Sequence, residues 1–217
     1  MKMLKALLAT SLLTVAAFQV NAASVTECGT DVCFTYENDT LFGTANIVGN
    51  TINFQPVNFF AESLNGAGAS AINETLNIMV EAITEGFNMT QFVLQEQGDY
   101  LLVGEGASAT AGGRFSVTSG TKQCENPFAP CSQAEQLNVA ELPGTNGQLV
   151  EWGLSSVIDI SENELWLRDS VIFMQIENRL SATTLNNAEQ AFIEKKSAGV
   201  GITVIPVPAA VWLLGSA

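Results

Sequence analysis

The chain contains no histidine among its 217 residues, and it has few charged residues. Without histidine, serine–histidine–aspartate catalysis and histidine-ligated metal sites are excluded. Charged residues make up 14% of the chain, whereas an average soluble domain has about 25%. Hydrophobic residues reach 47%, and disorder requires low hydrophobicity. The sequence therefore predicts a folded domain with a restricted choice of catalytic chemistry.

Positive charge is especially scarce. The chain has 8 Lys and Arg against 22 Asp and Glu, which gives a net charge of −14 and a pI near 4.1. Such a surface repels phosphate backbones, so we expect no nucleic acid partner. Negative charge can attract Ca²⁺ or basic partners, but it also keeps an extracellular domain soluble. We expect the solubility role, and no cofactor.

The first 22 residues have the ordered pattern of a secretory signal peptide. Lys2 and Lys5 give the positive start, and the apolar stretch from Leu7 to Phe18 is too short to span a bilayer. A small residue, Ala22, stands directly before the expected cut, and Ala23 follows it. A buried N-terminal helix is the alternative, and the order of the pattern disfavours it. We predict export through the secretion machinery.

The last residues combine prolines with an apolar run. Pro206 and Pro208 end the preceding strand because proline cannot donate to a ladder, and Trp212 is a residue that favours membrane interfaces. The run resembles the PEP-CTERM sorting signal, whose common form is Val-Pro-x-Pro-Ala-Ala-x-Trp-Leu-x-Gly-Ser. Ile205 stands where that form has Val. The residues that carry the resemblance are Pro206, Val207, Pro208, Ala209, Ala210, Trp212, Leu213, Gly215 and Ser216.

The resemblance implies a destination. Proteins with this signal are exported by Gram-negative bacteria and held at the inner membrane by a C-terminal helix. A membrane protease, exosortase, is then thought to recognise the signal and release the protein to the cell surface or extracellular matrix. The family signal continues into a full apolar helix and an Arg-rich tail, whereas this sequence stops at Ala217. We therefore expect the sequence to be a fragment that ends before its anchor.

Four cysteines form two close pairs, Cys28 with Cys33 and Cys124 with Cys131. An exported chain meets an oxidising compartment, in which such pairs form disulfides. Four cysteines allow three connectivities, and the local pairing is the one we expect. A zinc site is the alternative, but it needs tighter cysteine spacing or histidine.

Short segments of alternating apolar and polar residues recur between turn residues. This pattern predicts one all-β domain over residues 23–205, an antiparallel β-sandwich or jelly-roll-like fold. Residues 49–50 and 98–99 are expected hairpin turns, residues 120–147 a long loop, and residues 76–82 a strand that also fits a helix. The predicted strands span 44–48, 51–54, 76–82, 87–94, 100–103, 114–118, 149–152, 157–160, 164–167, 170–180, 191–194 and 201–205.

Two glycine-rich segments match the dinucleotide-binding fingerprint by letter. They run from Gly104 to Ala109 and from Gly66 to Ala71. The fingerprint needs a helix to follow, with the phosphate at its N-terminus, and neither segment has that context. We expect small residues in turns.

A calcium loop is weakly indicated near residue 160. Asp159, Ser161 and Asn163 have its first spacings, but the sixth and twelfth positions hold Glu164 and Ser170 instead of Gly and Glu. The EF-hand interpretation therefore fails, and a solvated acidic edge is expected. The residues of a looser Ca²⁺ site would be Asp159, Glu162, Glu164 and Asp169.

The sequence assigns no catalytic residue, because no pair of its many acids stands out as a glycosidase pair. We expect a non-enzymatic protein of the cell surface or extracellular matrix. A carbohydrate-binding module or adhesin that contacts extracellular polysaccharide is the alternative. Trp152, Trp166 and Tyr100 could form a sugar-stacking platform, but aromatic residues of a sandwich more often lie in its core.

Overall fold

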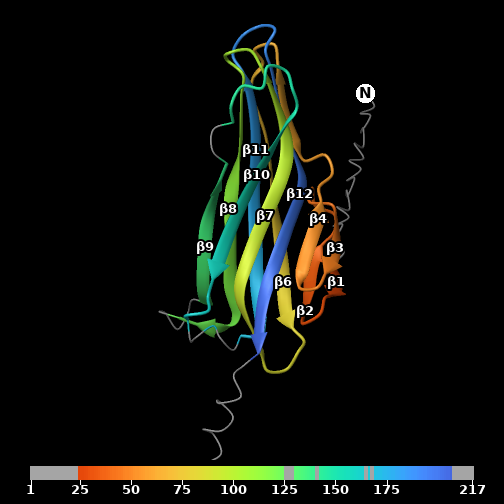
Figure 1. The fold of residues 1–217 in the computed structure, drawn as a ribbon, viewed down its shortest axis with the longest axis vertical. Helices are drawn as coiled ribbons and strands as arrows, with labels where there is room; N and C mark the ends of the chain where they lie inside the picture. The colour runs from red at the N-terminus through yellow and green to blue at the C-terminus, as the bar shows by residue number, and fades with distance from the viewer. Residues whose placement is uncertain (1–23, 125–129, 140–141, 164–165, 167–168, 207–217) are drawn as a thin grey trace, which may run out of the picture.

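The computed structural model describes residues 24–124, 130–139, 142–163, 166 and 169–206. In this part of the chain, twelve β-strands form two antiparallel sheets that pack face to face along the long axis of the molecule (Figure 1). The predicted all-β sandwich is confirmed. The described part of the chain contains no helical segment with the length and hydrophobicity of a transmembrane helix.

Each sheet contains strands from distant parts of the sequence. From β6 onward the chain changes sheet at almost every connection, as in jelly rolls. Sheet A has the order β1 (Ser24–Cys28), β2 (Val32–Glu37), β6 (Gly68–Ala82), β11 (Val171–Thr184), β8 (Ser108–Gln123) and β9 (Pro130–Asn138). Sheet B has the order β10 (Val150–Asp159), β7 (Phe87–Val103), β12 (Gln190–Pro206), β4 (Thr51–Gln55) and β3 (Thr44–Val48), and β5 (Phe60–Leu64) also pairs with β12.

The core lies between the two sheets and follows the strand period of two. On β6, Leu76, Ile78 and Val80 are buried, while the residues between them face outward. The opposing β7 contributes Phe92 and Leu94 to the same core. Residues 76–82 therefore form a strand, as predicted, and not the alternative helix. Their inward face packs against the opposite sheet.

The predicted hairpin turn at Gly98 and Asp99 is wrong. Both residues lie inside β7, which runs without a break from Phe87 to Val103. Gly98 is needed there because a Cβ would stand 1.9 Å from the Glu194 carbonyl oxygen and 2.7 Å from the Trp152 indole. A glycine inside a strand often marks such a close approach rather than a turn.

Other predicted breaks are also absent. The segments 149–152 and 157–160 belong to one strand, β10, and 191–194 and 201–205 belong to β12. The small and polar residues between these segments still form backbone hydrogen bonds with the neighbouring strand. A prediction from the hydrophobic pattern therefore makes the strands too short. The expected loop over residues 120–147 contains β9 and the end of β8. Of the predicted strand 164–167, only Trp166 is described, and it lies in a turn.

The β3–β4 hairpin and both disulfides agree with the sequence. Gly49, at the turn, has a φ of 61°. Disulfides join Cys28 to Cys33 across the β1–β2 hairpin and Cys124 to Cys131 beside the β8–β9 hairpin. No described cysteine is free, and the pairing indicates an oxidising environment.

Candidate functional site

The outer face of sheet A carries a strip of polar side chains across its central strands. Alternate residues of β6, β11 and β8 point away from the core, and the ladder places them in rows. Neighbouring rows along a strand lie about 7 Å apart. We call these four rows the sheet A strip. Its rows are Asn73–Arg179–Gly112, Thr75–Glu177–Arg114, Asn77–Gln175–Ser116 and Met79–Phe173–Thr118.

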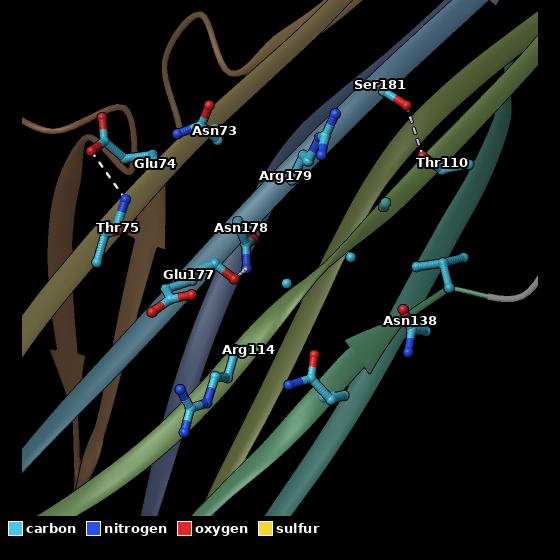
Figure 2. A pocket seen from close by; sticks show the side chains of 15 residues that line it. Asn73, Glu74, Thr75, Thr110, Arg114, Asn138, Glu177, Asn178, Arg179 and Ser181 are labelled. Carbon is cyan, nitrogen blue, oxygen red and sulfur yellow. Dashed lines mark hydrogen bonds between the residues drawn. The ribbon is translucent and has the colours of Figure 1, made fainter.

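An open groove of about 710 Å³ covers the first two rows and extends to Gln136 and Asn138 on β9 (Figure 2). Figure 2 shows Arg179 on β11 and Arg114 on β8, with amide and hydroxyl side chains and the carboxylates of Glu177 and Glu74 around them. Among the described residues, neither guanidinium lies within 4.0 Å of a carboxylate, because the ion pairs there involve only two lysines. Both arginines therefore keep their donors for another acceptor.

Two glycines shape the floor of this groove. A Cβ on Gly112 would approach the Leu137 carbonyl oxygen to 2.8 Å, and one on Gly113 would approach the Glu177 carbonyl oxygen to 1.8 Å. Beside Gly113 lies Asn178, which is only 3% exposed and whose Oδ1 has no hydrogen-bond partner among the described residues. A buried amide oxygen without a partner is rare, and the alternation along β11 turns this side chain toward the core, away from the two arginines.

The other two rows form a second, less polar hollow of about 470 Å³. Phe173 lines it and is 48% exposed, with Met79 beside it on β6. Gln175 donates a 2.9 Å hydrogen bond to Asn77 Oδ1 within the same lining. An exposed ring flanked by amides and hydroxyls has the chemistry that suits the face of a sugar ring.

The three aromatic residues considered for sugar stacking lie in the core, and the prediction that they are core residues is confirmed. Tyr100, Trp152 and Trp166 are 2%, 5% and 3% exposed. Trp152 also uses its indole N–H, which donates a 3.0 Å hydrogen bond to the Glu194 carbonyl oxygen. None of these rings is available to a glycan on the surface.

The looser calcium candidate is not assembled in the described residues. Asp159 accepts a hydrogen bond from the Ser161 backbone N–H, and the bonds from Ser161 hold the pKa of Asp159 below its ordinary value. Asp169 is buried and accepts bonds from Ser119 Oγ and from Thr121. No three acidic or cysteine side chains of the described residues gather as a metal site. Glu164 lies outside the described residues.

The glycines at 104 and 106 have a structural explanation. They form the β7–β8 turn, in which Glu189 from the β11–β12 connection is nearly enclosed, with 6% exposure. Its carboxylate accepts bonds from the backbone N–H groups of Gly106 (2.8 Å), Leu185 (2.9 Å) and Asn186 (2.8 Å), and from Asn186 Nδ2 (3.0 Å). These bonds, with those from Asn186 the strongest, lower the pKa of Glu189 to about 2. A Cβ on Gly106 would lie 2.7 Å from this carboxylate.

The residues of the two predicted address signals lie almost entirely outside the described part of the chain. This applies to the cleavage site at Ala22 and Ala23, and to positions 207–216 of the sorting signal. Pro206 is the last residue of β12 and stands opposite Phe87. Pro206 is also the last described residue of the chain, so the expectation that proline ends the strand stays a prediction.

Sequence reasoning missed the sheet A strip. Its residues come from three segments that are distant in the chain, so no local motif links them. The only local clue was the alternation over residues 170–180, which placed Gln175, Glu177 and Arg179 on one face. Their partners on β6 and β8 could not be identified before the strand order was known.

No protein-family profile matches the chain, and no curated protein matches it. A chain from infectious bursal disease virus, Gt strain, is 13% identical over 75% of this chain and 42% of its own, with a TM-score of 0.31. Winged bean acidic lectin with methyl-α-D-galactose is 9% identical over 70% and 98%, with a TM-score of 0.24. A carbohydrate-binding module of the β-sandwich superfamily is 9% identical over 84% and 97%, with a TM-score of 0.19. Likeness at this level does not bear on what the chain binds.

Proposed function

We propose that this chain is a non-enzymatic protein of the bacterial cell surface or extracellular matrix, exported by its signal peptide and sorted by its PEP-CTERM-like signal. The observation that supports it best is that the described residues between the two predicted signals form one β-sandwich. Two disulfides agree with export.

The sorting part of the proposal is tested in a bacterium that carries an exosortase gene and in the same strain without it. We expect surface delivery only in the first strain, with the mature chain starting at Ala23. Changing Pro208 and Trp212 to alanine leaves the protein in the inner-membrane fraction. Leu149→Ser, an exposed residue outside the signal, is the matched control. Normal surface delivery of the Pro208 and Trp212 variant would show that the sorting proposal is wrong.

A second function is favoured by the sheet A strip. We propose that this face binds an extracellular polysaccharide that carries carboxylates. Arg114 and Arg179 supply bidentate donors for carboxylates, and the amides around them supply bonds to hydroxyls. Phe173 offers a ring face to a sugar on the same strip. The groove lining also includes Glu74 and Glu177, so the two arginines offer donors at fixed positions in a lining of balanced charge.

Isothermal titration with a polyuronate and with an uncharged glucan tests this function. We expect binding of the polyuronate and about tenfold weaker binding by Arg179→Ala, because a hydrogen bond to a charged group contributes about 1.5–3 kcal/mol. Phe173→Ala should weaken binding of both polymers. Gln95→Ala, on the outer face of sheet B, is the matched control. Equal binding by all three variants would exclude the sheet A strip as the site.

A further inference from the structure

A lysine and a glutamate meet in the interior between the sheets. Lys195 Nζ on β12 lies 2.6 Å from Glu96 Oε1 on β7, and the two side chains are 0% and 1% exposed. The angles at this contact fall outside those of a hydrogen bond, and within the described residues neither atom has another hydrogen-bond partner. Among the described residues, the only polar group that Lys195 Nζ contacts is therefore the Glu96 carboxylate.

The strand pairing brings them together. Ordinary alternation along β12 places Lys195 inward, like Ala191 and Ile193, and Lys196 outward. Lys195 stands opposite Gly98, two residues from Glu96 on the same inward face of β7. The register then shifts between Lys195 and Ser197, so Ala198 stands opposite Glu96.

Aromatic rings enclose the ammonium group. Its Nζ lies 5.5 Å from the ring centroid of Phe42, 5.6 Å from that of Phe59 and 6.0 Å from that of Trp152. All three rings are buried, so the contact is shielded from water. Burial lowers the pKa of Lys195, and the Glu96 carboxylate opposes that effect only in part. Keeping both groups charged in such surroundings has a large desolvation cost.

We infer that Lys195 and Glu96 form an intramolecular amide bond after the chain has folded. A proton passes from the ammonium to the carboxylate, which leaves a neutral amine beside a neutral carboxylic acid. The amine nitrogen attacks Cδ of Glu96, and the new C–N bond forms as one C–O bond breaks. The departing oxygen carries two of the three ammonium protons and leaves as water. The step needs no oxidant, reductant or co-reactant.

Two physical effects favour this condensation. Folding holds amine and acid in contact, which raises their effective concentration far above that of free groups. The reaction also replaces two buried charges by one neutral amide, which removes the cost of their desolvation. The adjacent pair of Lys196 and Asp99 is also in contact, but it lacks the second condition, since the Lys196 side chain is 52% exposed to solvent.

The amide would link β7 and β12, which lie side by side in sheet B (Figure 1). It is a modification that neither the export nor the polysaccharide proposal requires. A surface protein would gain a covalent tie across its most extensive strand pair. The tie would persist in reducing conditions, in which both disulfides open.

Mass spectrometry of the purified full chain, reduced and denatured, tests the inference. We expect the intact mass to fall short of the sequence mass by one water molecule. After proteolysis, the peptides that contain Glu96 and Lys195 should appear as a single branched species. Lys195→Arg should restore the full mass, whereas Lys196→Arg, the neighbouring matched control, should retain the loss.

The wild-type peptide map decides the matter even if the Lys195 variant does not fold. Separate, unmodified peptides for Glu96 and Lys195, found together with the full intact mass, would overturn the inference. The loss of water at any other position in the chain would overturn it as well.

Discussion

Two enclosed glutamates of this molecule are stabilised in opposite ways. Glu189, at one end of the sandwich, accepts bonds from the N–H groups of three residues in two connecting loops. Glu96, between the sheets, faces a single lysine and no other donor to its Oε1 among the described residues. Exposure does not separate them, since they are 6% and 1% exposed.

The difference shows what each carboxylate does. Several fixed N–H donors hold Glu189 as an ion and fix the shape of the loops that supply them. Glu96 receives charge compensation from one flexible side chain, and each partner depends on the other. Glu189 thus stabilises the loops around it, whereas Glu96 and Lys195 are in contact in a geometry that suits amide formation.

Glu96→Ala should have the largest effect on stability. It leaves the Lys195 ammonium buried without a counter-charge, so we expect a loss of about 3–5 kcal/mol in the free energy of unfolding. Chemical denaturation measures this loss. Gln97→Ala, the next residue on the outer face, should stay within about 0.5 kcal/mol of the wild type. Equal effects of the two variants would mean that the buried pair stabilises nothing.

Asp169→Asn extends the comparison to a third carboxylate and should cost less. Asp169 resembles Glu189, because it accepts bonds from Thr121 Oγ1 (2.9 Å), the Val171 N–H (3.1 Å) and Ser119 Oγ. The NH₂ group of the new asparagine would face hydroxyl and N–H donors, so we expect the free energy of unfolding to fall by about 1–3 kcal/mol. Thermal unfolding measures this loss. Asp159→Asn, which changes an exposed carboxylate, is the control. A wild-type melting temperature for Asp169→Asn would contradict the prediction.

Glu189→Gln should change the pH dependence of stability. The folded pKa of Glu189 is about 2, against an ordinary value of 4.5. A lowered pKa gives stability that is present above pH 4.5 and is lost as the pH falls toward 2. The melting temperatures of wild type and variant should therefore differ most above pH 4.5 and converge near pH 2. A constant difference across this range would show that the carboxylate charge is not the cause.

Lys196→Met should have the smallest effect. Lys196 pairs with Asp99 and with Glu194 at 3.4 Å, and these contacts raise its pKa, but its side chain is half exposed. Water and salt screen such a pair, so its loss should be small and should vanish at high salt. Denaturation at low and high salt tests this expectation. A loss that matched that of Glu96→Ala would end the distinction between the buried and the exposed lysine.

Local pattern was sufficient for the fold class, the disulfides and some strands. Alternation over residues 76–82 identifies an inward face at Leu76, Ile78 and Val80. Gly49 and Asn50 mark a hairpin, and close cysteine spacing in an exported chain favours local bridges. These features depend on neighbours within a few residues, which is why the sequence alone predicts them.

Long-range pairing produced what the sequence could not predict. The Gly98–Asp99 pair is typical of a turn. In the structure, Gly98 lies inside β7, and its missing side chain leaves room for Trp152 and the Glu194 carbonyl group of the adjacent strands. Lys195 and Lys196 are adjacent in sequence, and only the pairing of β12 with β7 shows that Lys195 meets Glu96. Arg114 and Glu177 are adjacent only because β8 pairs with β11. Each case requires the sheet order, which no local motif encodes.

The position of β12 has a consequence under the proposal that the protein is held by its C-terminal tail. β12 precedes the residues that resemble the sorting signal. It pairs with β7 along its length on one side, and on the other side with β5 over residues 190–194 and with β4 over residues 198–201. A pull on the tail acts along this strand, parallel to its neighbours. Many ladder bonds then bear the load together, whereas an edge strand pulled sideways would unzip one bond at a time. Under that proposal, the strand that carries the load lies inside the sheet and not at its edge.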